Sequence, residues 1–310
     1  MQGIAWEDIM DENSTIAIRA NVMTSEPQNS MYVALKAKDG LVDRFRRRVG
    51  SRPNVDKDFP DFSIHLYVTD KIVEVSLDSS GTSLHQRGYR SATNIAPINE
   101  VLAAGILMLS GWRGDTDFLD PMCGSGTFLI EAAMIACNIP PNLNRKAFAF
   151  QKWSDWDNDL YEKIEASSLN RTRSFSHNIT GYDKAPSAIR KAAQNISNAN
   201  LEGFIKIERE DFFRTEKLDP DKSLHIVFNP PYGERLPIDV NVFYSRIGDN
   251  LKQSYVGTQA WFITANMEAL KHVGLRPSSR IKLFNGKLES KLVKYEIYSG
   301  TKKVHKSKTY

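Results

Sequence analysis

The sequence predicts an α/β protein in which a small α+β module precedes a Rossmann-like, mostly parallel sheet that ends in an antiparallel hairpin. Three observations lead to this prediction. From residue 117 onward, short apolar runs of strand type alternate with amphipathic helical segments. A glycine-rich turn follows the first of these strands at residues 120–127. Near the C-terminus, the turn dipeptide Asn285-Gly286 separates two further strand-like runs.

The first 80 residues are predicted to form the α+β module. Its expected elements are a strand at Thr15–Val22, a helix at Met31–Val49, and a hairpin of Phe62–Val68 and Ile72–Leu77. Turn residues near Ser79 then break the pattern. We therefore divide the chain into a module at 1–80 and a larger domain at 81–310.

The larger domain is predicted to alternate strands with helices, as a parallel sheet covered on both faces requires. The expected parallel strands are Asp117–Asp120, Asn178–Tyr182, Phe204–Glu208, His225–Phe228 and Gln259–Thr264. The expected helices are Pro97–Ser110, Gly126–Cys137, Pro186–Asn198 and Asn241–Tyr255, and the closing antiparallel strands are Ile281–Leu283 and Leu292–Tyr298.

The bulk composition is that of a chain that can bury at least one sizeable core, with 310 residues and 41% hydrophobic side chains. The longest apolar runs are too short to span a bilayer and the N-terminus has no signal pattern, so we expect a cytoplasmic protein with no membrane partner. Only Cys123 and Cys137 are present, and no histidines cluster. This pattern predicts neither a disulfide framework nor a metal site.

The turn after the first parallel strand is the candidate cofactor loop, with Asp120, Pro121, Gly124, Gly126 and Thr127 as its expected contacts. The glycines lack a Cβ, so backbone N–H groups can approach a ligand at the carboxyl end of a strand. The loop lacks the Gly-Lys-Thr end of a phosphate loop and the third glycine of a dinucleotide fingerprint. The Asp120 carboxylate would repel a phosphate but suits a cationic or zwitterionic amino-acid moiety.

Three further residues are candidate cofactor contacts at the ends of the next two strands. Asp183 can accept both hydroxyls of a ribose, with an ordinary surface aspartate as the alternative. Asp211 can accept a hydrogen bond from an adenine amino group while Phe212 covers the ring face. Core packing of Phe212 is the competing interpretation.

The strongest signal is the tetrapeptide after the fourth strand, which makes Asn229, Pro230, Pro231 and Tyr232 the candidate catalytic residues. Two successive prolines remove two backbone donors and leave rigid carbonyl acceptors beside the Asn229 side-chain oxygen. Acceptors without donors select an amino group, and the Tyr232 ring can stack on a base.

This arrangement predicts methyl transfer from a sulfonium donor to an exocyclic amine of a nucleobase. Hydrogen bonds from the amine to Asn229 and a proline carbonyl would favour pyramidalisation and aim the nitrogen lone pair at the methyl group. Orientation of two bound reactants can account for about 7 kcal/mol of barrier or more. No cysteine lies in the motif, so the covalent cysteine route used at pyrimidine C5 is not expected.

With these residues identified, the chain resembles the class I methyltransferases that carry a THUMP RNA-binding module, and most of all the bacterial RlmL-type guanine-N2 methyltransferases of large-subunit ribosomal RNA. The resemblance rests on the cofactor loop, Asn229–Leu236, and the segments Pro53–Asp56, Leu84–Arg90, Ala96–Glu100 and Ser110–Trp112.

The resemblance implies a class I methyltransferase sheet, S-adenosyl-L-methionine as cofactor, and RNA, specifically ribosomal RNA, as partner. It also implies that the segment around Pro97 contributes to the cofactor pocket and that Asn229–Tyr232 hold the target base. Residues 1–80 are too few for the family's complete RNA-binding region, so we expect an N-terminally truncated member with a partial THUMP module.

Several alternatives stay open at this point. Adenine N6 presents an exocyclic amine to the same acceptors, and a noncatalytic RNA-binding assembly factor is a further reading; a nucleotide-dependent oxidoreductase lacks its full glycine fingerprint. Two hypotheses also remain for the arginines of the first module, Arg44 and Arg46–Arg48: contact with RNA phosphates, or a charged helix face in solvent. For the aromatic residues between 148 and 156, the two hypotheses are a lid over the target base and packing in a core. For Arg90, they are contact with the substrate and a contact that braces the two domains. The sequence makes no prediction of oligomeric state.

Overall fold

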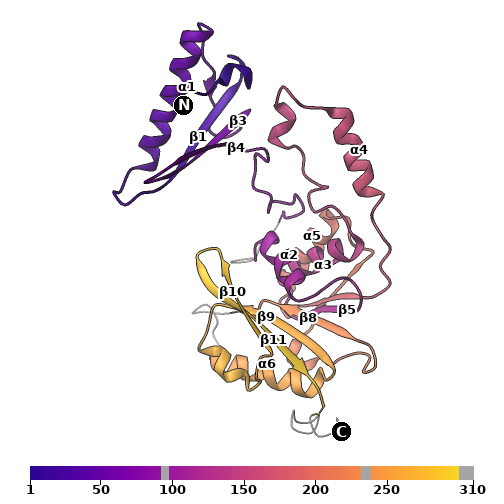
Figure 1. Ribbon diagram of the computed structural model, residues 1–310. Helices are drawn as coiled ribbons and strands as arrows, with labels where there is room; N and C mark the ends of the chain where they lie inside the picture. Colours follow the sequence, from indigo (N-terminus) through magenta and orange to yellow (C-terminus); the bar gives the residue numbers. More distant parts are fainter. Residues whose placement is uncertain (92–97, 232–238, 300–310) are drawn as a thin grey trace, which may run out of the picture. The chain divides into compact units, whose positions relative to one another are not determined.

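The computed structural model describes residues 1–91, 98–231 and 239–299 (Figure 1). The chain forms two compact units. The first comprises residues 1–84 together with 145–165, and the second comprises residues 85–144 and the chain after residue 165. The predicted α/β class, with a parallel sheet and a closing antiparallel hairpin, is confirmed. No helix in the described ranges has the length and apolar character needed to cross a membrane.

The first unit is a four-stranded sheet with one long helix. Its strands are β1 (Thr15–Met23), β2 (Asn54–Val55), β3 (Phe62–Thr69) and β4 (Val73–Leu77), in the order β2-β1-β3-β4. Helix α1 (Ser30–Arg48) connects β1 to its parallel neighbours, and β4 pairs antiparallel with β3. The Asn29 side chain caps α1 by accepting hydrogen bonds from the backbone N–H groups of Met31 and Tyr32. The buried side chains of α1 recur every three or four residues and face the sheet: Ala37, Leu41, Val42 and Phe45.

Residues 145–165 also belong to this first unit. They carry the 3-10 turn η2 (Ala149–Lys152) and the start of helix α4 (Asn158–Leu169), neither of which the sequence analysis predicted. Phe150 contacts three other rings, with centroid distances from 5.2 to 6.2 Å: Phe148, Trp156 and Tyr161. Trp153 packs against the core of the unit. The packing interpretation therefore accounts for these aromatic residues without a lid.

The second unit is a seven-stranded sheet in the order β10-β11-β9-β8-β5-β6-β7. Its strands are β5 (Asp117–Asp120), β6 (Ile179–Tyr182), β7 (Ile205–Glu208), β8 (Leu224–Phe228), β9 (Thr258–Thr264), β10 (Ser279–Asn285) and β11 (Leu288–Ile297). Strands β5 to β9 pair in parallel, while β11 runs antiparallel to both of its neighbours. Each predicted strand of this domain occurs, and β5 has its predicted bounds.

Helices cover both faces of this sheet (Figure 1). Helices α2 (Glu100–Leu109), α3 (Thr127–Cys137) and α5 (Pro186–Asn198) lie on one face, and α6 (Val240–Ser254) lies on the other. Successive residues of a strand point to opposite faces, so Val227 belongs to the core under α3 and Phe228 to the core under α6. Helix α2 starts later than predicted, because the Asn99 side chain caps it by accepting from the N–H groups of Val101 and Leu102.

Candidate functional site

Four loops converge at the carboxyl edge of the second sheet. Strand β5 lies between β6 and β8. The strands β6 and β7 are added on one side of β5, and the later strands, from β8 onward, are added on the other side. The loops that follow β5, β6, β7 and β8 leave the same edge, because these strands are parallel. Ligands of open α/β sheets bind outside such a switch point. The predicted site residues in the described ranges follow the ends of these four strands.

The glycine loop after β5 has the backbone that the sequence suggested. Gly124 and Gly126 adopt φ of 56° and 81°, in the left-handed region that favours glycine. A Cβ on Gly126 would lie 3.3 Å from the Cβ of Ala192 on α5, so the loop also packs closely against that helix. The Cys123 N–H donates to the carbonyl of Tyr182 at 2.8 Å, which ties the loop to the end of β6. These contacts hold the loop in one shape at the strand end.

Asp183 links the end of β6 to the glycine loop. Its Oδ2 accepts the Gly124 N–H at 3.1 Å and its Oδ1 accepts the Ala185 N–H at 2.9 Å. Each carboxylate oxygen can accept a further hydrogen bond, since a carboxylate offers about four acceptor positions. The half-buried Asp183 side chain therefore has the capacity to bind two neighbouring hydroxyls while it shapes the loop.

Asp120 is buried at the end of β5, with 1% of its surface exposed. Its Oδ1 accepts the Met122 N–H at 3.1 Å. Burial raises the pKa of the Asp120 carboxyl well above its ordinary value, and the neighbouring Asp183 carboxylate raises the pKa further. A cationic group placed beside Asp120 would favour the charged form of this carboxyl and lower its pKa. This position therefore suits the ammonium group of an amino-acid moiety better than any anion. Pro121, the next residue, is buried as well.

Thr127 begins α3 and is held by Arg90, whose part in the site the sequence left undecided. The Thr127 Oγ1 accepts a hydrogen bond from Arg90 Nη2 at 2.9 Å, and the same nitrogen donates to the carbonyl of Ile98 at 3.0 Å. Arg90 Nε lies 2.9 Å from Glu100 Oε1, at the start of α2. Arg90 therefore braces the cofactor loop against the α2 N-terminus within one unit. Pro97, the predicted pocket residue beside Ile98, lies outside the described residues.

Asn195 on α5 is a second loop-holding residue, and the sequence did not point to it. Its Nδ2 donates to the Ser125 carbonyl at 3.0 Å, and its Oδ1 accepts the Ser91 N–H at 3.2 Å. The side chain is 1% exposed. A single asparagine inside a helical pattern carries no sequence signal of this kind, since its role depends on two partners about 70 and 104 residues away.

Asp211 and Phe212 follow β7 and take different places. Asp211 is half-buried, and its Oδ1 accepts the Phe213 N–H at 3.2 Å. Phe212 is 2% exposed and packs against Phe228 and Tyr255, with ring centroids 5.9 and 5.5 Å away. This placement favours the core-packing interpretation of Phe212. Asp211 retains free acceptor capacity at the carboxyl edge.

Asn229 directly follows β8 at this edge. Its Oδ1 is buried, and no donor in the described part of the chain bonds to it. An unpaired buried acceptor costs about 1–3 kcal/mol, so such an atom is best explained by a donor that binds there. Pro230 is buried and Pro231 is exposed, while Tyr232 lies outside the described residues. The motif thus presents an acceptor that the described residues leave without a hydrogen-bond donor.

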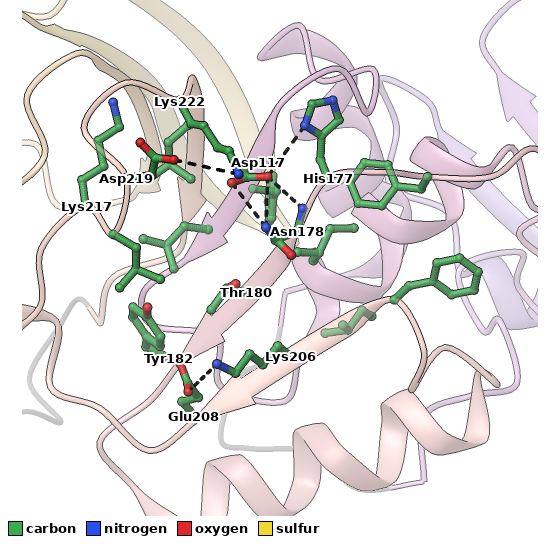
Figure 2. Close-up of a pocket in the computed structure, with 18 of the residues that line it drawn as sticks. Asp117, His177, Asn178, Thr180, Tyr182, Lys206, Glu208, Lys217, Asp219 and Lys222 are labelled. Atoms are coloured by element: carbon green, nitrogen blue, oxygen red, sulfur yellow. Dashed lines mark hydrogen bonds and ion pairs between the residues drawn. The ribbon is translucent and has the colours of Figure 1, made fainter.

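A cavity of about 620 Å³ lies elsewhere on the second unit (Figure 2). Its lining starts at the amino ends of the strands, with Asp117 and Asn178, and extends to Tyr182 and Glu208. Neither Asn229 nor the glycine loop lines it. Its charged groups largely pair with one another, as Lys206 Nζ and Glu208 Oε1 do at 2.8 Å. The cavity is therefore separate from the candidate site. In the described ranges, no group of three or more His, Cys, Asp or Glu side chains could hold a metal ion.

Comparison with known proteins places the two parts of the chain in known families. Residues 87–294 match a family model described as an RMKL-like methyltransferase domain, and residues 1–78 match the THUMP domain. The chain belongs to the RMKL-like methyltransferase family. The methyltransferase match thus covers β5 to β9 and the loops that follow these strands, including the glycine loop and Asn229.

Curated relatives of this RMKL-like methyltransferase are named ribosomal RNA large subunit methyltransferase K/L. The protein of Allochromatium vinosum is 39% identical over 304 residues, which cover 95% of this chain and 41% of the relative. That of Syntrophotalea carbinolica is 37% identical over 307 residues, which cover 95% of this chain and 43% of the relative. The chain spans about two fifths of the length of these relatives.

Among solved structures, the crystal structure of SMU.472 complexed with SAH superposes with a TM-score of 0.85 at 28% sequence identity. The match covers 97% of this chain and 79% of that one. The arrangement of strands described above is therefore shared with a protein that holds SAH.

Proposed function

We propose that this chain is an S-adenosyl-L-methionine-dependent methyltransferase that acts on an exocyclic amine of a base in RNA, with guanine N2 of large-subunit ribosomal RNA as the target. The observation that carries the proposal is the buried Oδ1 of Asn229, which has no donor among the described residues and lies at the sheet edge of the glycine loop. The family and the names of the curated relatives support the reaction class and the RNA substrate.

The residues around the glycine loop fit the proposed cofactor. Gly124 and Gly126 leave room for close approach to the backbone, and Asp183 has spare acceptors for ribose hydroxyls. Asp120 suits the amino-acid ammonium group, and Asp211 has acceptors for the adenine amine. The complex of SMU.472 with SAH, the demethylated form of this cofactor, supports the same assignment. When bound, S-adenosyl-L-methionine supplies a methyl group on a positively charged sulfur.

The residues of the Asn229 motif act on the nucleophile. Asn229 Oδ1 and the Pro230 carbonyl accept hydrogen bonds from the two N–H groups of the target amine, and thereby orient its lone pair. The prolines keep the backbone of the motif rigid, so the acceptors need no reorganisation when the base enters. Tyr232 stacks on the base in this proposal. The nitrogen forms its new bond to the methyl carbon and then releases a proton, so no strong general base is required.

Transfer of labelled methyl from S-adenosyl-L-methionine to total RNA and to DNA tests the proposal. We expect label in RNA, and a decrease of at least about tenfold in Asn229→Ala, a modest loss for a group that acts in the transition state. Asn170→Ala, an exposed asparagine away from the motif, is the matched control and should retain activity. Analysis of digested nucleosides then separates N2-methylguanosine from N6-methyladenosine. Label confined to DNA, or N6-methyladenosine alone, would contradict the target, and full activity of Asn229→Ala would contradict the site.

Calorimetry with the cofactor tests the role of Asp183 separately from transfer. We expect Asp183→Ala to weaken binding by at least about tenfold, since hydrogen bonds to a charged carboxylate contribute about 1.5–3 kcal/mol. Asp219→Ala, an exposed aspartate on the loop before β8, is the control and should bind normally. Unchanged affinity in Asp183→Ala would remove the ribose assignment.

A further inference from the structure

The hairpin of β10 and β11 is strongly basic. Its residues 279–297 contain five basic side chains and two acidic ones, Glu289 and Glu296. The basic residues are Arg280, Lys282, Lys287, Lys291 and Lys294. This local excess of three positive charges forms a basic surface, and such a surface attracts polyanions.

Part of this charge has no ion-pair partner in the described part of the chain. Lys282 pairs with Glu289 at 2.8 Å, and Lys294 pairs with Glu296 at 3.0 Å. Within the described ranges, no carboxylate lies within ion-pair distance of Arg280, Lys287 or Lys291. These three cations are therefore available to an external anion.

Large apolar side chains stand exposed at the tip of the same hairpin. Phe284 and Leu288 lie beside the Gly286-Lys287 turn and are 57% and 55% exposed. The Lys282 ammonium lies 5.4 Å from the centre of the Phe284 ring. Exposed aromatic rings bordered by cations form the platforms on which unpaired bases stack, because every base offers a flat face and every nucleotide a phosphate.

The register places these side chains on one face. Arg280, Lys282 and Phe284 alternate along β10, and Lys282 pairs directly with Lys291 of β11. Alternate residues of a strand and their directly opposed partners share a face of the sheet. The face therefore carries three cations and the Phe284 ring, with Glu289 directly opposite Phe284 near the tip.

The tip projects past the candidate site. Strand β9 ends at Thr264, which pairs with Lys291, so Leu283–Asn285 and Leu288–Ser290 extend beyond it by about 10 Å at 3.4 Å per residue. In Figure 1 this yellow hairpin extends past the neighbouring strand. Only β9 separates β11 from β8, whose end leads into Asn229. At about 4.8 Å per strand, the lateral separation is about 10 Å.

We propose that the β10–β11 hairpin is an RNA-binding element that holds an unpaired segment next to the target nucleotide. Phe284 stacks on a base, and Arg280, Lys287 and Lys291 contact phosphates. This inference rests on the proposed function, because it takes the substrate to be RNA whose target base reaches Asn229. Beyond the proposed function, the inference assigns RNA binding to one specific surface of the methyltransferase domain, the β10–β11 hairpin.

Binding of a fluorescein-labelled oligoadenylate of about 12 nucleotides, followed by anisotropy, tests the hairpin directly. We expect Phe284→Ala to weaken binding by at least about fivefold, the lower end of measured base–aromatic stacking effects. Lys291→Gln should reduce the slope of log Kd against log salt by about 0.7, the value for one lost contact to single strands. Phe204→Ala, at the amino end of the opposite edge strand, and Lys222→Gln, before β8, are matched controls that should leave both quantities unchanged.

Methylation of protein-free large-subunit ribosomal RNA gives the second readout. Phe284→Ala should raise the KM for RNA while the calorimetric affinity for S-adenosyl-L-methionine stays at the wild-type value. Oligoadenylate and ribosomal RNA affinities that do not change in Phe284→Ala and Lys291→Gln overturn the inference. Light scattering of the free protein gives a further test. A lower mass for Phe284→Ala than for wild type would show that the tip contacts a second copy of the chain, and this result would also overturn the inference.

The two proposals fail in different ways. If wild-type chain methylates no RNA, the proposed function is wrong, while the anisotropy measurement still decides whether the hairpin binds RNA. If wild-type chain methylates RNA and the hairpin variants match it in affinity and KM, the hairpin inference alone is wrong.

Discussion

His225 is predicted to make the second unit less stable as the pH falls below neutrality. The ring lies on β8, with 9% of its surface exposed, and its Nε2 is 2.8 Å from Ser110 Oγ. The Ser110 hydroxyl donates to the Leu107 carbonyl at 2.7 Å, so the ring Nε2–H donates to Ser110. Trp112 packs 5.7 Å from the ring. A second proton would have to enter this apolar surrounding on Nδ1.

Burial lowers the pKa of His225 from 6.5 to about 4, and Lys294 adds to this effect while Asp115 opposes it. As the pH falls, His225 therefore binds a second proton near pH 6.5 in the unfolded chain but only near pH 4 in the folded chain. Between these values the unfolded state binds more protons, so stability is full above pH 6.5 and decreases as the pH falls. Each pH unit costs about 1.4 kcal/mol, which gives about 2 kcal/mol at pH 5 and about 3 kcal/mol at the lower limit.

Urea unfolding at pH 7.5 and pH 5 measures this loss of unfolding free energy. Hydrogen exchange of the β8 peptide, detected by mass spectrometry, is the probe of unfolding. His225→Asn cannot take up the proton, and its packing defect is the same at both pH values. The difference in unfolding free energy between wild type and His225→Asn should therefore shrink by about 2 kcal/mol from pH 7.5 to pH 5. A difference that stays constant would refute the assignment of a neutral, buried His225.

Three substitutions test contacts that hold the second unit together. Gly248→Ala would place a Cβ 1.7 Å from the Val273 carbonyl oxygen, so thermal denaturation should reveal a loss of about 3 kcal/mol or more; an unchanged Tm would argue against this packing of α6. Arg90→Ala leaves the buried Glu100 carboxylate unpaired and should cost about 3–5 kcal/mol in urea unfolding, with partial recovery in Arg90→Lys. Gly126→Ala forces a side chain into left-handed φ of 81° at a cost of about 1–2 kcal/mol and should weaken cofactor binding in calorimetry, whereas wild-type affinity would contradict the loop geometry.

The sequence predicted a helix or strand correctly where its apolar residues recur with the spacing of that element. Helix α5 occurs with its predicted bounds, because apolar residues recur along it with helical spacing and Pro186 is suited to the first turn. A turn likewise closes the predicted hairpin, and Gly286 adopts φ of 63° in it. Its central residues are Gly286 and Lys287, one position later than predicted, because Asn285 still pairs with Leu288. Both signals lie within a few residues of the structure that they determine.

Long-range packing was not predictable in the same way. Residues 145–165 join the first unit through contacts such as that of Lys152 with Asp61, which is 91 positions earlier in the chain. Helix α4 in this region has no buried residue, and its apolar pattern is weak. The core position of Phe212 also depends on which strands and helices surround it, and the sequence left that choice open.

The order of residues along the chain is enough to show which chemical groups follow which strands: glycines after β5, carboxylates after β6 and β7, and Asn229 with two prolines after β8. The folded structure was needed to show that Asp183 joins the glycine loop, that Arg90 and Asn195 brace it, and that Asn229 Oδ1 is buried with no donor among the described residues. The two kinds of feature differ in the sequence distance over which they are set. A motif depends on the conformations of a few neighbouring residues, whereas burial and hydrogen-bond partners depend on the whole order of the sheet.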